Sequence, residues 1–101
     1  MSEQAVYQKA ERDKVARAFY ADGQLVALPA RMRKRLYILN DFARLFAVGS
    51  DYPEKAVNEA IAPVYEDYCT IRRELVDFGF MARDAQGYRR LQPDDWLPEL
   101  W

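Results

Sequence analysis

The chain of 101 residues contains no histidine and only one cysteine, Cys69. The lack of histidine excludes imidazole bases, histidine metal ligands and histidine-containing catalytic triads. A lone cysteine cannot form an internal disulfide or a cysteine metal cluster, and it is typical of a reducing cytoplasm. The four glycines are isolated, so the chain has no glycine-rich phosphate loop. These absences predict a cytoplasmic protein that is not an enzyme and that carries neither cofactor nor metal.

Long hydrophobic runs are also missing, although half of the residues are hydrophobic. No run approaches the roughly 20 apolar residues of a membrane span, and the opening MSEQAVYQKAERDK has no apolar segment of the kind found in secretory signals. The length predicts one domain over residues 1–101, with a modest core in 14–91 and a C-terminal tail at 92–101. The net charge of −1 argues against strong non-specific DNA binding by the chain as a whole, because dedicated nucleic-acid binders are usually basic.

The spacing of apolar residues predicts helices over residues 3–22, 30–48, 53–62 and 67–78. Gly23 is expected to end the first helix, and Pro29 to lie in the first turn of the second. The second helix is the most apolar, so it is predicted to be the central buried one. Pro63 stops the third helix. The apolar run 25–28 is either a buried extended segment or a crossing loop, and four residues do not decide between them.

The stretch DYCTIRRELVDFGFMARDAQGYRR, residues 67–90, organises this interpretation. Asp67 is the expected N-cap of its helix and Gly79 the residue that closes it. The pattern then becomes short and extended over 80–91, with the four-residue connection 84–87, which predicts a hairpin. Two short helices joined by a tight turn, preceded by a longer helix and followed by a hairpin, have the order of a winged helix-turn-helix. The predicted fold is therefore α+β, mostly helical, with an additional N-terminal helix and a C-terminal hairpin wing.

The candidate nucleic-acid-binding residues lie on the last predicted helix and on the hairpin. They are Thr70, Arg72, Arg73, Arg83, Arg89 and Arg90. Arginine binds phosphates and reads base edges, but these arginines also have structural alternatives. Those of the helix can pair with carboxylates, and Glu74 and Asp77, expected on the same outward face, would repel phosphates. Those of the hairpin can be ordinary strand charges that block edge pairing. The cluster Arg31–Arg35 has the same two interpretations.

The tail and the cysteine are each open to two interpretations. Trp96 and Trp101 belong either to a docking segment for another protein or to a tail that folds back over apolar surface. Cys69 is either a small helix residue or a redox-sensitive thiol.

Three motifs in order resemble a known bacterial family. They are Tyr52, Glu54, Val57 and Asn58; Ile71 to Asp77 in IRRELVD; and Tyr88 with Arg90. Together with the run FYADGQLVALPARMRKRLYIL, they resemble the "domain of unknown function 2087" family over roughly residues 14–90. The chain departs from that family in lacking a histidine near Tyr65 and in having isoleucine in place of leucine at position 71. The resemblance implies a winged-helix-like fold and a role in transcription regulation, and it carries over no catalytic residue.

Two functions follow as expectations. The first is a transcription regulator that binds double-stranded DNA through the helix 67–78 and the hairpin. The alternative is a protein–protein interaction module of the same fold, with its partner captured by the C-terminal tail. No membrane association is predicted, and the oligomeric state stays open, a homodimer included, although no heptad seam supports one.

Overall fold

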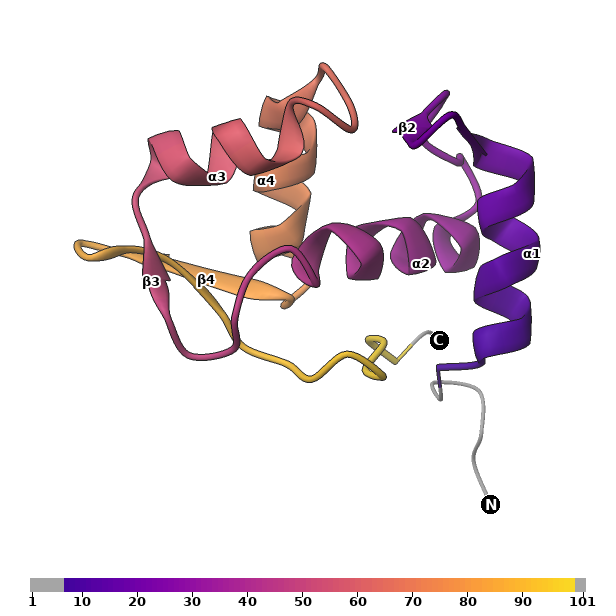
Figure 1. Ribbon diagram of the computed structural model, residues 1–101. Coiled ribbons are helices and arrows are strands. Elements are labelled where there is room, and N and C mark those ends of the chain that lie inside the picture. The colour runs from indigo at the N-terminus through magenta and orange to yellow at the C-terminus, as the bar shows by residue number, and fades with distance from the viewer. Residues whose placement is uncertain (1–6, 100–101) are drawn as a thin grey trace.

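The computed structural model describes residues 7–99, so the start of the first predicted helix lies outside the described residues. Within this range the chain is α+β, with four helices and two small antiparallel sheets (Figure 1). The elements are α1 (Lys9–Phe19), β1 (Tyr20–Ala21), β2 (Gln24–Leu25), α2 (Met32–Ala43), β3 (Asp51–Tyr52), α3 (Glu54–Ile61), α4 (Tyr68–Asp77), β4 (Met81–Asp84) and β5 (Gly87–Arg90). The predicted α+β class is confirmed.

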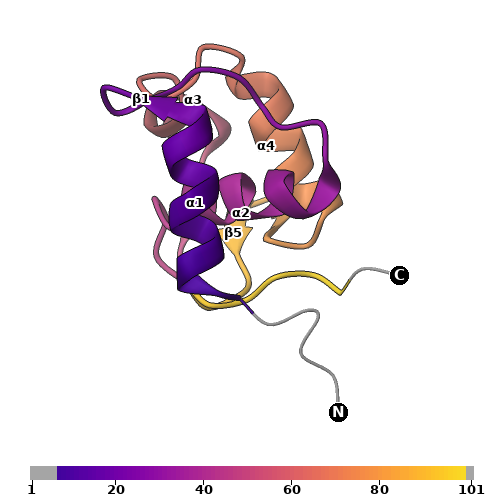
Figure 2. The ribbon, with the colours of Figure 1, turned by 90° about the vertical axis from the view of Figure 1, so that its right-hand side faces the viewer.

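Helix α2 lies at the centre of the molecule, with α1 packed against it and α4 on another side (Figures 1 and 2). Every residue from Leu36 to Asn40 is buried. The prediction that this helix is the central one is therefore confirmed, but its bounds are shorter than 30–48. Pro29 precedes the N-cap Arg31 instead of lying in the first turn. After Ala43 the chain leaves the helix and runs beside β5, where the Gly49 N–H donates to the Arg90 carbonyl at 3.0 Å.

The first predicted helix also ends earlier than expected, because a small hairpin replaces its last turn. Tyr20 pairs with Leu25 and Ala21 with Gln24. Asp22 and Gly23, with φ of +54° and +77°, form the two-residue loop between the strands. Two consecutive positive φ values are those of a type I′ turn, for which Asp-Gly is a preferred sequence. Leu25 is buried and donates its N–H to the Val64 carbonyl at 2.8 Å, so the apolar run begins as a buried extended segment.

A third strand completes the sheet of the C-terminal hairpin. Strand β3, between α2 and α3, pairs with β5, which gives the strand order β3-β5-β4. The sequence did not predict this strand, which has only two residues. Gly87 makes the pairing possible, because its φ is +118° and a Cβ there would overlap the Tyr52 carbonyl oxygen. The predicted four-residue connection is a two-residue loop, since Asp84 pairs with Gly87.

Helices α3 and α4 lie within one residue of their predicted bounds. The predicted cap of α4 is confirmed, because Asp67 accepts from the Thr70 N–H at 3.3 Å. Its C-terminal end is closed by two bonds, from the Gly79 N–H to the Val76 carbonyl and from the Phe80 N–H to the Leu75 carbonyl. This is a Schellman motif with glycine at the position predicted for it. The motif turns the chain from α4 directly into β4.

Candidate nucleic-acid interface

Helix α4 presents one narrow stripe to solvent. Ile71 and Leu75 are fully buried on its inner face, while Cys69, Arg73 and Asp77 are exposed at successive steps of four residues. Arg73 lies at the middle of this stripe. Its side chain has no hydrogen-bond or ion-pair partner in the part of the chain that the structure describes. Arg73 is therefore the cation of α4 that is most available to a ligand.

Glu74 does not lie on the outward face, which corrects the sequence-based expectation. It faces α2, where Arg35 donates to both of its oxygens, from Nε at 2.7 Å and from Nη2 at 2.5 Å. Both side chains are mostly buried, at 23% and 16% exposed. This bond raises the pKa of the Arg35 guanidinium. One of the two carboxylates expected to repel phosphates is thus neutralised inside the protein, and only Asp77 remains on the stripe.

The other two candidates on α4 have structural partners. Arg72 turns toward α3, where its Nη1 donates to the Asn58 side-chain oxygen and lies 3.9 Å from the Glu54 carboxylate. Its side chain is 17% exposed. Thr70 donates its hydroxyl to Asp67 at 2.8 Å, as part of the cap of α4. Arg72 therefore follows the structural alternative given for it, in which the arginine pairs with another side chain of the protein. Its partners, Asn58 and Glu54, lie on α3.

The three hairpin arginines differ sharply in exposure. Arg83 is 65% exposed, and its guanidinium lies 5.6 Å from the centre of the Tyr88 ring. Arg89 is 45% exposed and makes a two-point bond to Asp51 of β3, with both distances at 3.0 Å. This pairing raises the pKa of the Arg89 guanidinium. Arg83 is therefore the hairpin cation that extends furthest into solvent.

Arg90 is not a surface cation, and its prediction as a wing contact is corrected. It is 4% exposed and donates to the Phe46 carbonyl, the Gln92 carbonyl and the Asp94 carboxylate, at 2.9, 2.9 and 2.6 Å. The bond from Arg90 lowers the pKa of Asp94. Alternation along β5 explains the burial, because exposed Arg89 and buried Arg90 point to opposite faces of the sheet. Arg90 joins β5 to the segments on either side of it.

A concave cleft of about 370 Å³ lies between α4 and the hairpin. Its lining residues are Arg72, Arg73, Val76, Asp77, Arg83 and Tyr88. The fold thus brings together three of the six candidates, Arg72, Arg73 and Arg83. Thr70 is at the start of α4, Arg89 is occupied by β3, and Arg90 is inside. We refer to this concavity as the arginine cleft.

Two of the four cations of the basic cluster Arg31–Arg35 make contacts between helices, and the other two, Arg31 and Lys34, are exposed. Arg33 bonds to Glu11 of α1 at 2.8 and 3.0 Å, and this bond lowers the pKa of Glu11. Arg35 holds Glu74 as described above. Cys69 is exposed and free, in agreement with a single cysteine on a helix surface.

The described part of the tail folds back onto α2, which confirms the interpretation of Trp96 as part of a tail that covers apolar surface. The Asn40 side chain donates to the carbonyls of Asp94 and Trp96 at 2.8 and 2.9 Å. Leu97 is buried, and the Trp96 ring meets Phe80 edge to face at 5.1 Å. Trp101 lies outside the described residues.

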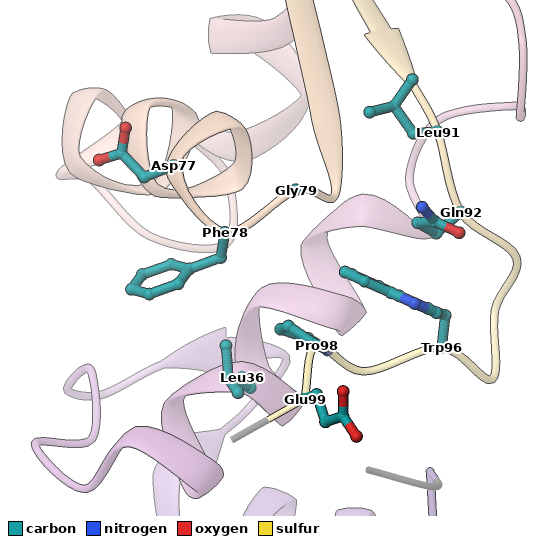
Figure 3. Close-up of a pocket in the computed structure, with 9 residues that line it drawn as sticks. All are labelled: Leu36, Asp77, Phe78, Gly79, Leu91, Gln92, Trp96, Pro98 and Glu99. Carbon is teal, nitrogen blue, oxygen red and sulfur yellow. The ribbon is translucent and has the colours of Figure 1, made fainter. Parts of the chain in front are cut away.

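The folded tail leaves an apolar groove against the C-terminal end of α4 and the side of α2 (Figure 3). Its volume is about 660 Å³, and its lining residues are Leu36, Asp77, Phe78, Gly79, Leu91, Gln92, Trp96, Pro98 and Glu99. Phe78 and Trp96 stand on opposite sides of the groove in Figure 3. No sequence pattern indicated this groove, because its walls come from segments far apart in the chain. We refer to it as the apolar groove.

Neither a metal cluster nor a membrane span is found in residues 7–99. No three side chains of the metal-ligating types gather there. No helix in the described range has both the length and the apolar character that crossing a bilayer requires.

The fold and the cleft define a small α+β domain with an arginine-lined concavity between α4 and the β4–β5 hairpin. The chain belongs to a family of uncharacterised proteins conserved in bacteria, domain of unknown function 2087, whose model matches residues 24–90, about two thirds of its length. The resemblance seen in the sequence is thus confirmed, with a match that starts at residue 24 and not at residue 14. No curated protein and no solved structure matches the chain.

Proposed function

We propose that this protein is a cytoplasmic DNA-binding regulator of the transcription type with a winged-helix arrangement. Helix α4 serves as the recognition helix and the β4–β5 hairpin as the wing. The observation that carries the proposal is the arginine cleft, in which cations from both elements meet beside the exposed stripe of α4.

The order of the elements supports this arrangement. In α2-β3-α3-α4-β4-β5, a short strand precedes the two helices and pairs with the last strand of the hairpin. That pairing holds the hairpin to the body of the domain. Contacts between α4 and β4 fix the hairpin beside α4, so both elements can meet one duplex.

The exposed positive charge of α4 and the hairpin gives modest support to the proposal of DNA binding. Arg73 has no partner in the described chain, and Arg83 is 65% exposed. Asp77 on the same stripe and the net charge of −1 oppose phosphates. We therefore expect binding that is weak at physiological salt and carried by few phosphate contacts. Thr70, Arg72 and Arg89 are secondary contacts in this proposal, because each already donates a hydrogen bond inside the protein. Arg83 makes a looser ion pair with Glu54, at 3.7 Å.

The test is fluorescence anisotropy of the purified protein with a random-sequence duplex over a range of salt concentrations. With two or three phosphate contacts, the logarithm of the association constant should fall against the logarithm of salt with a slope of about −2 to −3. Arg73→Ala should weaken binding and make the slope less steep by about one unit. The matched control is Arg17→Ala, which removes the same charge from an exposed position of α1. Helix α1 lies away from α4 and the hairpin, on the other side of the molecule (Figure 1). Equal losses for both variants, or no binding at low salt, would refute the proposal.

A protein-interaction module is the second candidate, and the apolar groove favours it. Leu91 on its wall is 44% exposed, so Leu91→Glu should abolish capture of a protein partner without unfolding the domain. Val26→Glu is the control, because Val26 is a 68% exposed apolar residue outside the groove. If both variants capture the same partner as the unchanged protein, the groove is not the docking surface.

A further inference from the structure

The carboxylate of Glu54, the first residue of α3, faces donors from α4 and the hairpin. The Tyr88 hydroxyl donates to its Oε1 at 3.2 Å. Nη2 of Arg83 lies 3.7 Å from the same oxygen, and Nη1 of Arg72 lies 3.9 Å from Oε2. The Glu54 side chain is nevertheless 47% exposed. Three donors therefore converge on one oxyanion at the surface of the protein.

The donors are held in place by contacts that do not involve Glu54. Arg72 is fixed by its bond to Asn58. The guanidinium of Arg83 lies over the Tyr88 ring, and Tyr88 itself is 3% exposed. If Glu54 turned into solvent, Arg72 and Tyr88 would keep their positions, and the exposed Arg83 would remain beside the Tyr88 ring. Two guanidinium groups and one hydroxyl would then face another anion. Preorganised donors of this kind bind oxyanions with little cost of ordering.

We infer that the arginine cleft and the donors around Glu54 form a phosphate-binding site, in which the Glu54 carboxylate acts as an internal counter-ion. Guanidinium pairs match the geometry of phosphate oxygens, and a phosphate carries more acceptor oxygens than a carboxylate. Arg73, which lines the same cleft without a partner, adds a third cation. The site itself is inferred from the geometry alone. The assignment of its phosphate to a DNA backbone rests on the proposed function.

Glu54 competes with the ligand, so removing its charge should strengthen binding. Glu54→Gln keeps the side-chain length and an acceptor for the Tyr88 hydroxyl, but leaves the arginines without their counter-ion. For partly exposed charges the expected gain in affinity for phosphate is about two- to fivefold. Glu59→Gln is the matched control, because Glu59 is an exposed residue of the same helix and has no ion-pair partner in the described chain.

The experiment titrates inorganic phosphate into each variant and follows the amide and arginine side-chain signals by NMR. We expect saturable shifts at Arg72, Arg83 and Tyr88 that are reached at lower phosphate in Glu54→Gln than in Glu59→Gln. Adding Arg83→Ala to Glu54→Gln should remove the gain. Shifts scattered over the surface, or equal effects of the two glutamine variants, would overturn the inference, since net charge alone would then explain them.

A duplex titration of the same variants separates this inference from the proposed function. If the site takes DNA phosphates, Glu54→Gln should tighten duplex binding and steepen its salt slope by about one unit. Phosphate binding at the site without any duplex binding would leave the site in place and refute the DNA function. Duplex binding that is unaffected by Glu54→Gln, together with unmoved Arg72 and Arg83 signals, would refute the site and leave DNA binding in place.

Discussion

Two neighbouring arginines on β5 provide a sharp test of the structure. Arg89 and Arg90 are consecutive residues with the same side chain, yet the side chain of Arg89 is 45% exposed and that of Arg90 is 5% exposed. We predict that Arg90→Ala destabilises the domain strongly, whereas Arg89→Ala changes stability little.

The size of the effect follows from the partners of Arg90. Its loss leaves the carbonyls of Phe46 and Gln92 without their donor and Asp94 without its cation. A hydrogen bond from a charged donor contributes about 1.5–3 kcal/mol, and an unsatisfied buried carbonyl costs about 1–3 kcal/mol. Asp94 is 66% exposed, so water replaces its partner and adds little. We therefore expect a loss of about 2–4 kcal/mol for Arg90→Ala.

Arg90→Lys tests the geometry apart from the charge. Lysine keeps the positive charge but cannot reach three acceptors with one ammonium group in the way that a planar guanidinium does. It should lose about 1–2 kcal/mol, intermediate between arginine and alanine. Arg89 pairs with an exposed carboxylate on the surface, and such pairs contribute little to stability.

The assay is urea unfolding followed by circular dichroism, with the midpoint and slope compared among the variants. A loss of this size is a large share of the stability of a small domain, so the shift of the midpoint should be obvious. Equal midpoints for Arg89→Ala and Arg90→Ala would refute the alternation of exposure along β5 and the internal role of Arg90.

Three further predictions concern other parts of the fold. Leu97→Ala should cost about 2–4 kcal/mol in urea unfolding, because the tail fills the core with this side chain and a cavity would remain; an unchanged midpoint would show that the tail is not packed. Gly87→Ala should destabilise more than Gly23→Ala in thermal unfolding, because both have positive φ but only a Cβ at Gly87 overlaps the neighbouring strand; the reverse order would contradict the pairing of β3 with β5. The bond from Arg33 lowers the pKa of Glu11 below its ordinary value of 4.5, so its stabilisation is complete above pH 4.5 and is lost as the pH falls through the lowered pKa. Unfolding measured from pH 6 to pH 2 should therefore show a smaller loss of stability for Glu11→Gln than for the unchanged protein, and parallel curves would argue against the bond.

The sequence alone determined the elements whose signals are local. The bounds of α3 and α4 follow from apolar spacing and from residues with defined conformational roles, such as Asp67 as a cap and Gly79 as a terminator. The central position of α2 follows from its sequence, because apolar residues cover more of its surface than of any other predicted helix. The family could also be inferred from short motifs, because they lie in order along the chain.

Local signals failed where two interpretations compete over a few residues. The pattern of the first helix continued through Tyr20, and the Asp22-Gly23 pair fitted a helix end as well as a hairpin turn. The structure shows the hairpin, because the strands after the turn pair with each other and Leu25 reaches the core. A strand as short as β3 carries no periodicity, so only its pairing with β5 reveals it.

Tertiary structure alone decided which charges are available. From the sequence, Arg73, Glu74 and Arg90 are all expected to be exposed to solvent. Whether each is exposed in the structure depends on partners that are far away along the chain. Arg35 takes Glu74 from another helix, and three acceptors enclose Arg90. Arg73 finds no partner in the described chain and stays at the surface. The spacing of charges on one helix does not predict their partners on other elements, because the packing of the helices decides which side chains meet. The same packing places the arginine cleft beside α4.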